Sequence, residues 1–226
     1  MQLSNLIPIA RPSASSTSRR PLWLLSGFWI CVVISIAVVL RRLIALLLPT
    51  PVRPTQTAAL DSAFSSHAWL TAMHIIPAAI FVVLAVFVLL GRAGQSLQQL
   101  FYTFGALTGA TAYAMSSYAI GGWIERSAVL VFDTWFLASL SRAYWLHWRG
   151  DAPREREWTI RAVGILLGIA TTRPVMGVFF ATSARTHLVP SQFFGVAFWI
   201  GFSINSIIVE LWLHSKRRAQ LHRPQM

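Results

Sequence analysis

Six long apolar stretches constrain this chain more than any other feature. They cover Leu22–Leu40, Ala68–Leu90, Leu100–Ile120, Ala128–Trp148, Arg161–Ala181 and Phe193–Leu213. A helix needs about 20 apolar residues to cross the hydrocarbon core of a bilayer, and these stretches are near that length. Helices also satisfy their own backbone hydrogen bonds, as a membrane requires. The sequence therefore predicts an all-α, polytopic transmembrane bundle of about six helices.

Composition excludes most other classes of protein. Only 12% of the 226 residues are charged, against about 25% in a soluble domain. The single cysteine, Cys31, excludes a disulfide scaffold. The 19 basic residues outnumber the 7 acids and give a net charge of +12. These basic residues lie between apolar stretches rather than along one helix face, so we expect no nucleic-acid partner.

The pattern divides the chain into four parts. We expect a cytoplasmic N-terminal segment at residues 1–21, then a first transmembrane helix and outer loop at 22–66. A five-helix membrane core follows at 67–213, with a basic cytoplasmic tail at 214–226. The first apolar stretch is too long for the apolar region of a signal peptide, which indicates a helix that is not cleaved.

The distribution of Arg and Lys predicts the orientation, because loops rich in these residues face the cytoplasm. With the N-terminus inside, the inner loops hold 12 basic residues and the outer loops hold 5. We therefore expect both termini to be cytoplasmic. Anionic lipid head groups are the partners that such inner loops attract.

Five ionisable residues fall within the apolar stretches. They are His74, Asp133, Arg142, Arg173 and Glu210. Ionisable groups at membrane depth are costly, so each one is a functional hypothesis. At about 1.5 Å per residue, three of the five lie at one depth in the outer half of the bundle. These three are His74, Asp133 and Arg173.

Asp133 and Arg173 form the expected ion pair, and His74 could complete a triad with Asp133. Two readings stay open at this point. The pair locks two helices together, or the three residues form a proton- or ligand-handling site that opens outward. Pro77 and Pro174 lie close to His74 and Arg173 in sequence, and prolines free backbone carbonyls near membrane binding sites.

Arg142 and Glu210 lie in the inner halves of their stretches. They are candidates for an inner-side ion pair, and both are close enough to the interface to reach it. We favour a structural role for this second pair.

The histidines and sequence motifs give little support to a cofactor. His67 and His74 are seven residues apart, or about 10 Å along a helix, which is too far for one metal ion. Only His74 lies well inside the membrane, so the two facing histidines of a bis-histidine haem site are not found. No nucleotide-binding or hydrolase motif occurs. We expect no metal and no catalytic residue, with haem kept as an alternative cofactor.

Two small-xxx-small motifs predict close helix packing. Gly105 and Gly109 form one motif, and Gly164 and Gly168 form the other. Such positions let helix backbones approach closely. We favour packing within the chain, with a homo-oligomer through these faces as the alternative.

Several short motifs between residues 67 and 213 resemble a family of predicted integral membrane proteins, the domain of unknown function twenty-three-oh-six. They are His74-Ile75, Gly121-Gly122, Trp135, Arg149-Gly150-Asp151, Trp158 with Arg161, Thr172-Arg173 and Glu210. The resemblance implies a helical bundle in a bacterial cytoplasmic membrane, with no reaction assigned. The chain departs from the family pattern at Glu155 and near Gln98–Gln99, where the family tends to have histidine. Haem or metal ligands at those family positions would be missing here.

Three hypotheses about function follow from these observations. The first, which we favour, is a non-enzymatic membrane protein that binds or moves a small solute or proton through His74, Asp133 and Arg173. The second is a membrane oxidoreductase that holds haem or quinone near His74. The third is a structural or assembly protein that uses the glycine faces and basic loops.

Overall fold

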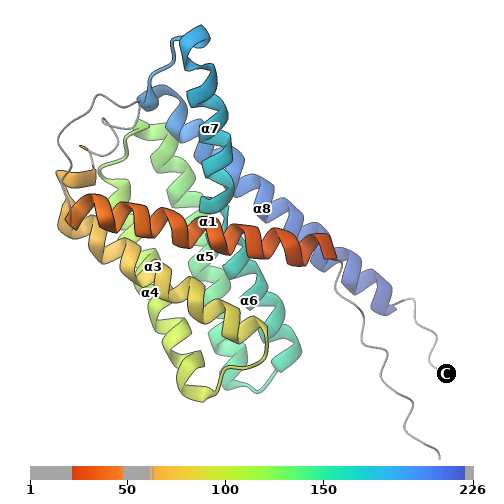
Figure 1. The fold of residues 1–226 in the computed structure, drawn as a ribbon. Helices are drawn as coiled ribbons and strands as arrows, with labels where there is room; N and C mark the ends of the chain where they lie inside the picture. Colours follow the sequence, from red (N-terminus) through yellow and green to blue (C-terminus); the bar gives the residue numbers. More distant parts are fainter. Residues whose placement is uncertain (1–21, 48–61, 63, 222–226) are drawn as a thin grey trace, which may run out of the picture.

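A computed structural model describes residues 22–47, 62 and 64–221, and all regular structure within these ranges is helical (Figure 1). The helices are α1 (Leu22–Leu47), α3 (Ala68–Leu89), α4 (Gln95–Ser116), α5 (Gly122–Trp148), α6 (Ala152–Leu166), α7 (Gly168–Thr186) and α8 (Pro190–Leu221). The predicted all-α class is confirmed. The predicted N-terminal segment 1–21 and most of the expected outer loop lie outside the described residues.

The helices after α1 form a bundle in which the direction alternates from one helix to the next, except that α7 continues the direction of α6 (Figure 1). α3 packs on α4, α5 packs on α4, α6 and α8, and α7 packs on α8. Only Leu167 separates α6 from α7, so the two make one nearly continuous run. With that run counted once, the described helices match the expected first helix and five-helix core.

The bundle has two ends that differ in chemistry. At the upper end in Figure 1, α4 is joined to α5 and α7 to α8. At the lower end, α3 is joined to α4 and α5 to α6. We call the upper end the cavity end, because it contains the cavity described below. We call the lower end the basic end, because the arginine-rich segment 149–161 lies there.

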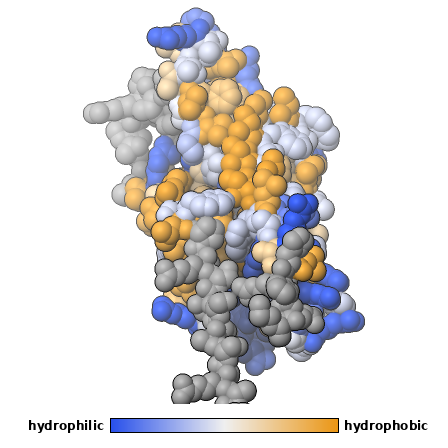
Figure 2. All heavy atoms as spheres, turned by 90° about the vertical axis from the view of Figure 1, so that its right-hand side faces the viewer, coloured by the Kyte–Doolittle hydropathy of each residue, from blue (hydrophilic) through white to orange (hydrophobic). Residues whose placement is uncertain are grey.

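Four helical runs are long and apolar enough to cross a membrane. They are Leu22–Leu47, Ala68–Leu89, Ala152–Thr186 and Pro190–Ala219. α4 and α5 are long enough to cross a membrane, but neither contains a sufficiently apolar run. Figure 2 shows one face on which apolar side chains form a broad band between hydrophilic groups at the two ends. The chain therefore has the helices and the surface of a membrane protein.

α1 lies at the edge of the bundle, against α3 and α7. It buries only Val32 and Ser35, whereas Trp23, Ile30 and Val33 are more than half exposed. An exposed apolar face of this kind suits lipid. α1 also continues through Arg41-Arg42 to Leu47, beyond its predicted end at Leu40. Arginine and leucine are both good helix formers, and a change in polarity alone does not end a helix.

The predicted glycine motifs pack within the chain. A Cβ atom at Gly105, Gly109, Gly164 and Gly168 would lie 2.5 to 2.7 Å from Leu140, Leu137, Val209 and Phe202, respectively. These distances are shorter than any normal contact of a Cβ atom. The chain's own side chains therefore fill the faces that we considered for a homo-oligomer.

The C-terminal boundary differs from the expected one. α8 extends without a break to Leu221, so most of the predicted basic tail that starts at residue 214 is helical. This extension carries Arg217 to Glu157 of α6, where the two form an ion pair. The contact ties the end of α8 to the basic end of the bundle.

Candidate functional site

A cavity of about 220 Å³ lies between α1 and the other helices at the cavity end. Every helix of the described chain contributes to its wall. An engineered protein cavity of about 150 Å³ holds a benzene molecule. By the same proportion, this cavity could hold a ligand of roughly nine non-hydrogen atoms, or several water molecules. Its walls are mainly apolar, with a small number of charged groups, which is the usual composition of a small-molecule site.

The three residues that the sequence singled out all line this cavity. His74 comes from α3, Asp133 from α5 and Arg173 from α7. His74 and Asp133 lie in the first halves of helices that run from the cavity end to the basic end, and Arg173 lies on the α6–α7 run that returns. The structure thus brings the three residues to one site.

Asp133 and Arg173 do not form the ion pair that we expected. No charged group of the described chain lies within ion-pairing distance of Asp133, and its Oδ2 atom is buried without a hydrogen bond. The Nε atom of Arg173 is also buried without a partner, and Nη1 reaches only the sulfur of Met176, at 3.9 Å. The reason lies in the packing: α5 contacts α6 and α8, whereas α7 contacts α8 and α1. The cavity therefore separates the two charges.

His74 is held across the interface between α3 and α4. Its Nδ1 atom lies 3.1 Å from the hydroxyl of Thr111. That hydroxyl has two backbone acceptors within reach, Leu107 O at 2.8 Å and Thr108 O at 3.0 Å. The Thr111 hydroxyl therefore links the His74 ring to the backbone of α4.

Two further charged residues line the cavity, and sequence reasoning missed both. Glu125 begins α5, and its Oε2 atom accepts a hydrogen bond of 2.7 Å from the backbone N–H of Gly121. Arg42 of α1 lies with its Cζ atom 4.3 Å from the centre of the Phe64 ring. Both residues lie just outside the predicted apolar stretches, Arg42 after Leu22–Leu40 and Glu125 before Ala128–Trp148. The position of Glu125 just after Gly121-Gly122 was the available signal, since carboxylates favour the first turn of a helix.

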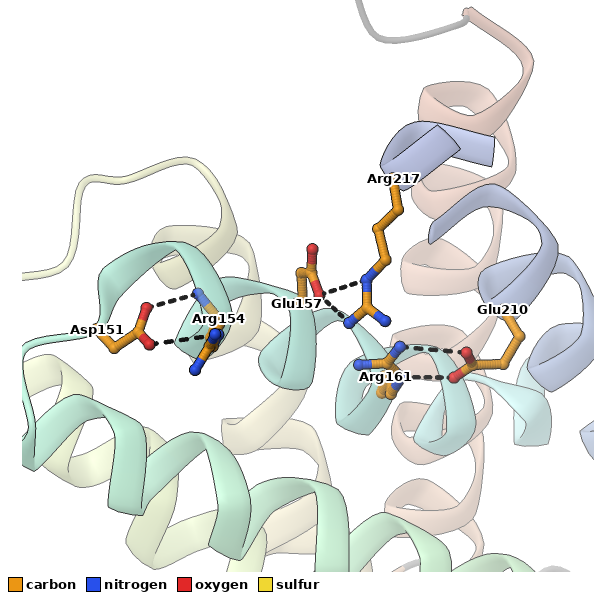
Figure 3. A network of polar contacts seen from close by, with 6 residues as sticks. All are labelled: Asp151, Arg154, Glu157, Arg161, Glu210 and Arg217. Carbon is orange, nitrogen blue, oxygen red and sulfur yellow. Dashed lines mark hydrogen bonds and ion pairs between the residues drawn. The ribbon is translucent and has the colours of Figure 1, made fainter. Parts of the chain in front are cut away.

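The basic end contains a network of paired charges (Figure 3). Arg161 of α6 donates to both carboxylate oxygens of Glu210 on α8, at 2.6 and 3.2 Å. Arg217 of α8 donates to Glu157 of α6 through two nitrogens. Arg154 lies 3.6 Å from Asp151 at the start of α6. These pairs join α6 to α8 and stabilise the first turn of α6.

The predicted pair of Arg142 with Glu210 is wrong. Glu210 pairs with Arg161, while Arg142 lies with its Cζ atom 4.2 Å from the centre of the Trp145 ring. Arg142 is on the exposed side of α5, so it does not face α8. Arg161 is the first residue of a predicted apolar stretch, and this position in the sequence does not indicate that it faces Glu210.

Glu155 is a buried carboxylate at the basic end, and three side chains converge on its Oε1 atom. Gln98 and Tyr102 of α4 donate to it, the latter at 3.0 Å, and Nδ1 of His147 on α5 lies at 3.3 Å. Gln98 and Glu155 are therefore in direct contact. They join α4 to α6.

Comparison with known protein families, curated proteins and solved structures finds no match for this chain. Within the described ranges, no three His, Cys, Asp or Glu side chains are grouped so that they could hold a metal ion. The function is therefore inferred from the geometry of the cavity and of the charge networks.

Proposed function

We propose that the protein binds or moves a small solute, or protons, through the cavity between α1 and the rest of the bundle. The observation that carries this proposal is that Asp133 and Arg173 line one cavity without forming an ion pair. An isolated charge in a low-dielectric interior is expensive unless something compensates it. A bound solute, or water and protons in transit, supplies that compensation.

The proposed setting is the bacterial cytoplasmic membrane, crossed several times, with both termini on the cytoplasmic side. The gathering of arginines at the basic end supports this orientation, because basic groups favour the cytoplasmic side. The cavity would then lie in the outer half of the membrane. Exposed basic side chains such as Arg154 and Arg218 would meet anionic lipid head groups. Membership of the resembled family remains a prediction.

Replacement of Arg173 by leucine tests the function. Wild-type protein and the Arg173→Leu variant are purified in detergent, and native mass spectrometry measures any small molecule that stays bound. The same proteins in liposomes that enclose a pH-sensitive dye report proton movement. We expect a bound species or a proton flux in the wild type and its loss in the variant.

Arg142→Leu is the matched control, because Arg142 also lies within a long helix but contacts the Trp145 ring and is not part of the cavity wall. It removes one arginine from an apolar helix without changing the cavity wall. Equal binding and flux in the wild type and Arg173→Leu would overturn the proposal. Loss in Arg142→Leu alone would do the same.

The oxidoreductase alternative fits the cavity less well. Among the described residues of its wall His74 is the one histidine, and a porphyrin ring is larger than the roughly nine non-hydrogen atoms that a space of about 220 Å³ holds. An absorption spectrum of the purified protein, before and after reduction with dithionite, tests this alternative directly. A Soret band that shifts on reduction would favour it.

A further inference from the structure

We infer that the ligand of the cavity is a small zwitterion, with a cationic and an anionic group on a short apolar body. This inference rests on the proposed function and adds the chemical class of the ligand. It follows from the arrangement of charges, the apolar lining and the volume of the cavity.

Two charged residues of the cavity wall, Asp133 and Arg173, are unpaired. Asp133 Oδ2 and Arg173 Nε are both buried and lack hydrogen bonds, and they come from two different helices that line the cavity, α5 and α7. A ligand ammonium group would compensate Asp133, and a ligand carboxylate would compensate Arg173. A ligand with only one charge would leave the other protein charge buried and unpaired, which is the costly state.

The other charged groups in the wall already have partners. Glu125 accepts the hydrogen bond from Gly121, and Arg42 lies against the Phe64 ring. The Nδ1 atom of His74 is bonded to Thr111. In the described chain, Asp133 and Arg173 are therefore the charged residues of the wall that form no ion pair and no hydrogen bond to an oxygen or nitrogen atom.

The volume and the apolar lining of the cavity limit the size and the apolar part of the ligand. Phe132, Phe136, Phe194, Phe198 and Phe202 form much of the wall. Burial of a ligand alkyl group against such rings is favourable by about 25 cal/mol for each Å² removed from water. With space for roughly nine non-hydrogen atoms, the cavity suits a molecule of the size of an aliphatic amino acid.

The test uses three probes that share one alkyl group and differ only in charge. They are leucine, 4-methylpentanoate, which lacks the amine, and 3-methylbutylamine, which lacks the carboxylate. Isothermal titration calorimetry measures the binding of each probe to the full chain in detergent. We expect leucine to bind at least about tenfold more tightly than either analogue, since about 1.4 kcal/mol corresponds to a factor of ten.

Two variants assign the two charges. In Arg173→Met, leucine should lose its advantage over 3-methylbutylamine, because nothing remains to hold the carboxylate. In Asp133→Asn, leucine should lose its advantage over 4-methylpentanoate. Arg142→Met is the matched control and should keep the order of the wild type, since Arg142 is outside the cavity wall.

The outcomes separate this inference from the proposed function. If a single-charge analogue binds as tightly as leucine, the cavity binds solutes but the zwitterion inference is wrong. If no probe binds while mass spectrometry finds a species that depends on Arg173, the zwitterion inference is again wrong and the proposed function stands. If no probe binds and neither a bound species nor a flux depends on Arg173, both fail.

Discussion

The two ends of this bundle hold similar ionisable residues in different states. At the basic end, Arg161 and Glu210 form a two-point ion pair, and three side chains surround Glu155. At the cavity end, Asp133 is buried and Arg173 is half-buried, and neither forms an ion pair in the described chain. The residue types are the same, so the difference lies in whether each charge meets a partner within the chain.

Under the proposed function, this difference separates charges that hold the helices together from charges that are available to a ligand. A paired and hydrogen-bonded carboxylate joins helices, and its removal leaves donors unsatisfied. An unpaired charge beside a cavity contributes nothing to packing and is available to a ligand. We therefore expect substitutions at the basic end to lower stability, and substitutions in the cavity to lower binding.

Glu155→Ala should have the largest effect on stability. The change leaves Gln98, Tyr102 and His147 without their shared acceptor. Tyr102 is buried and its unsatisfied donor costs about 1 to 3 kcal/mol, while the half-buried Gln98 and His147 cost less, so we expect a total loss of about 3 kcal/mol. Unfolding of the detergent-solubilised protein, followed by circular dichroism, measures the loss. A change below about 1 kcal/mol would show that the cluster does not hold α4 to α6.

Gly201→Ala should have the next largest effect. A Cβ atom at Gly201 would lie 2.6 Å from the backbone nitrogen of Thr172, so α8 must move away from α7. Overpacking of this kind costs about 1 to 3 kcal/mol. This position is near the cavity wall, and its loss of stability would show that close helix packing, rather than the charges, supports the cavity end.

Gly177→Ala is the matched control for Gly201→Ala. Gly177 also lies within a helix, but nothing is within 4 Å of an added Cβ atom. Alanine is the better helix former by about 0.5 to 1 kcal/mol, so this variant should be as stable as the wild type or more stable. Equal losses in the two variants would contradict a specific contact between α7 and α8 at Gly201.

Much of the fold could be predicted from the sequence, because apolar stretches of membrane length specify helices and their order. The stretch Ala68–Leu90 matches α3 to within one residue at both ends. The stretch Ala128–Trp148 has the same last residue as α5, which begins earlier, at Gly122. The extension of α1 beyond Arg41-Arg42 could not be predicted in this way. Hydropathy marks where a chain becomes polar, whereas a helix ends where its backbone hydrogen bonds end.

The candidate site was predicted in part. The cost of burying charge singled out His74, Asp133 and Arg173, and the period of a helix gave their depth. The sequence could not predict whether Asp133 and Arg173 meet, because depth along a helix says nothing about which helices are neighbours. The same gap led to the wrong partner for Glu210, which pairs with Arg161.

Asp133→Leu should show the opposite behaviour to Glu155→Ala. Asp133 has no ionic partner to lose, and an apolar side chain of similar size removes an uncompensated buried charge. We expect stability to be unchanged or to rise by about 1 kcal/mol, with loss of ligand binding. Unfolding in detergent and calorimetry with leucine measure the two effects. A loss of stability as large as that of Glu155→Ala would erase the distinction between the two ends.

Arg154→Gln should have the smallest effect, although it breaks an ion pair at the basic end. The side chain of Arg154 is 73% exposed, and its nitrogen lies 3.6 Å from Asp151. Water and salt screen such pairs, which contribute about 0 to 1 kcal/mol, so we expect a loss below about 0.5 kcal/mol that vanishes in high salt. Asp151 still caps α6 by accepting from the backbone N–H of Arg154, and the variant keeps that bond. We attribute the stability of the basic end to pairs with a buried member, such as the pair of the buried Arg161 with Glu210. A larger, salt-independent loss in Arg154→Gln would contradict this and show that exposed pairs contribute as much.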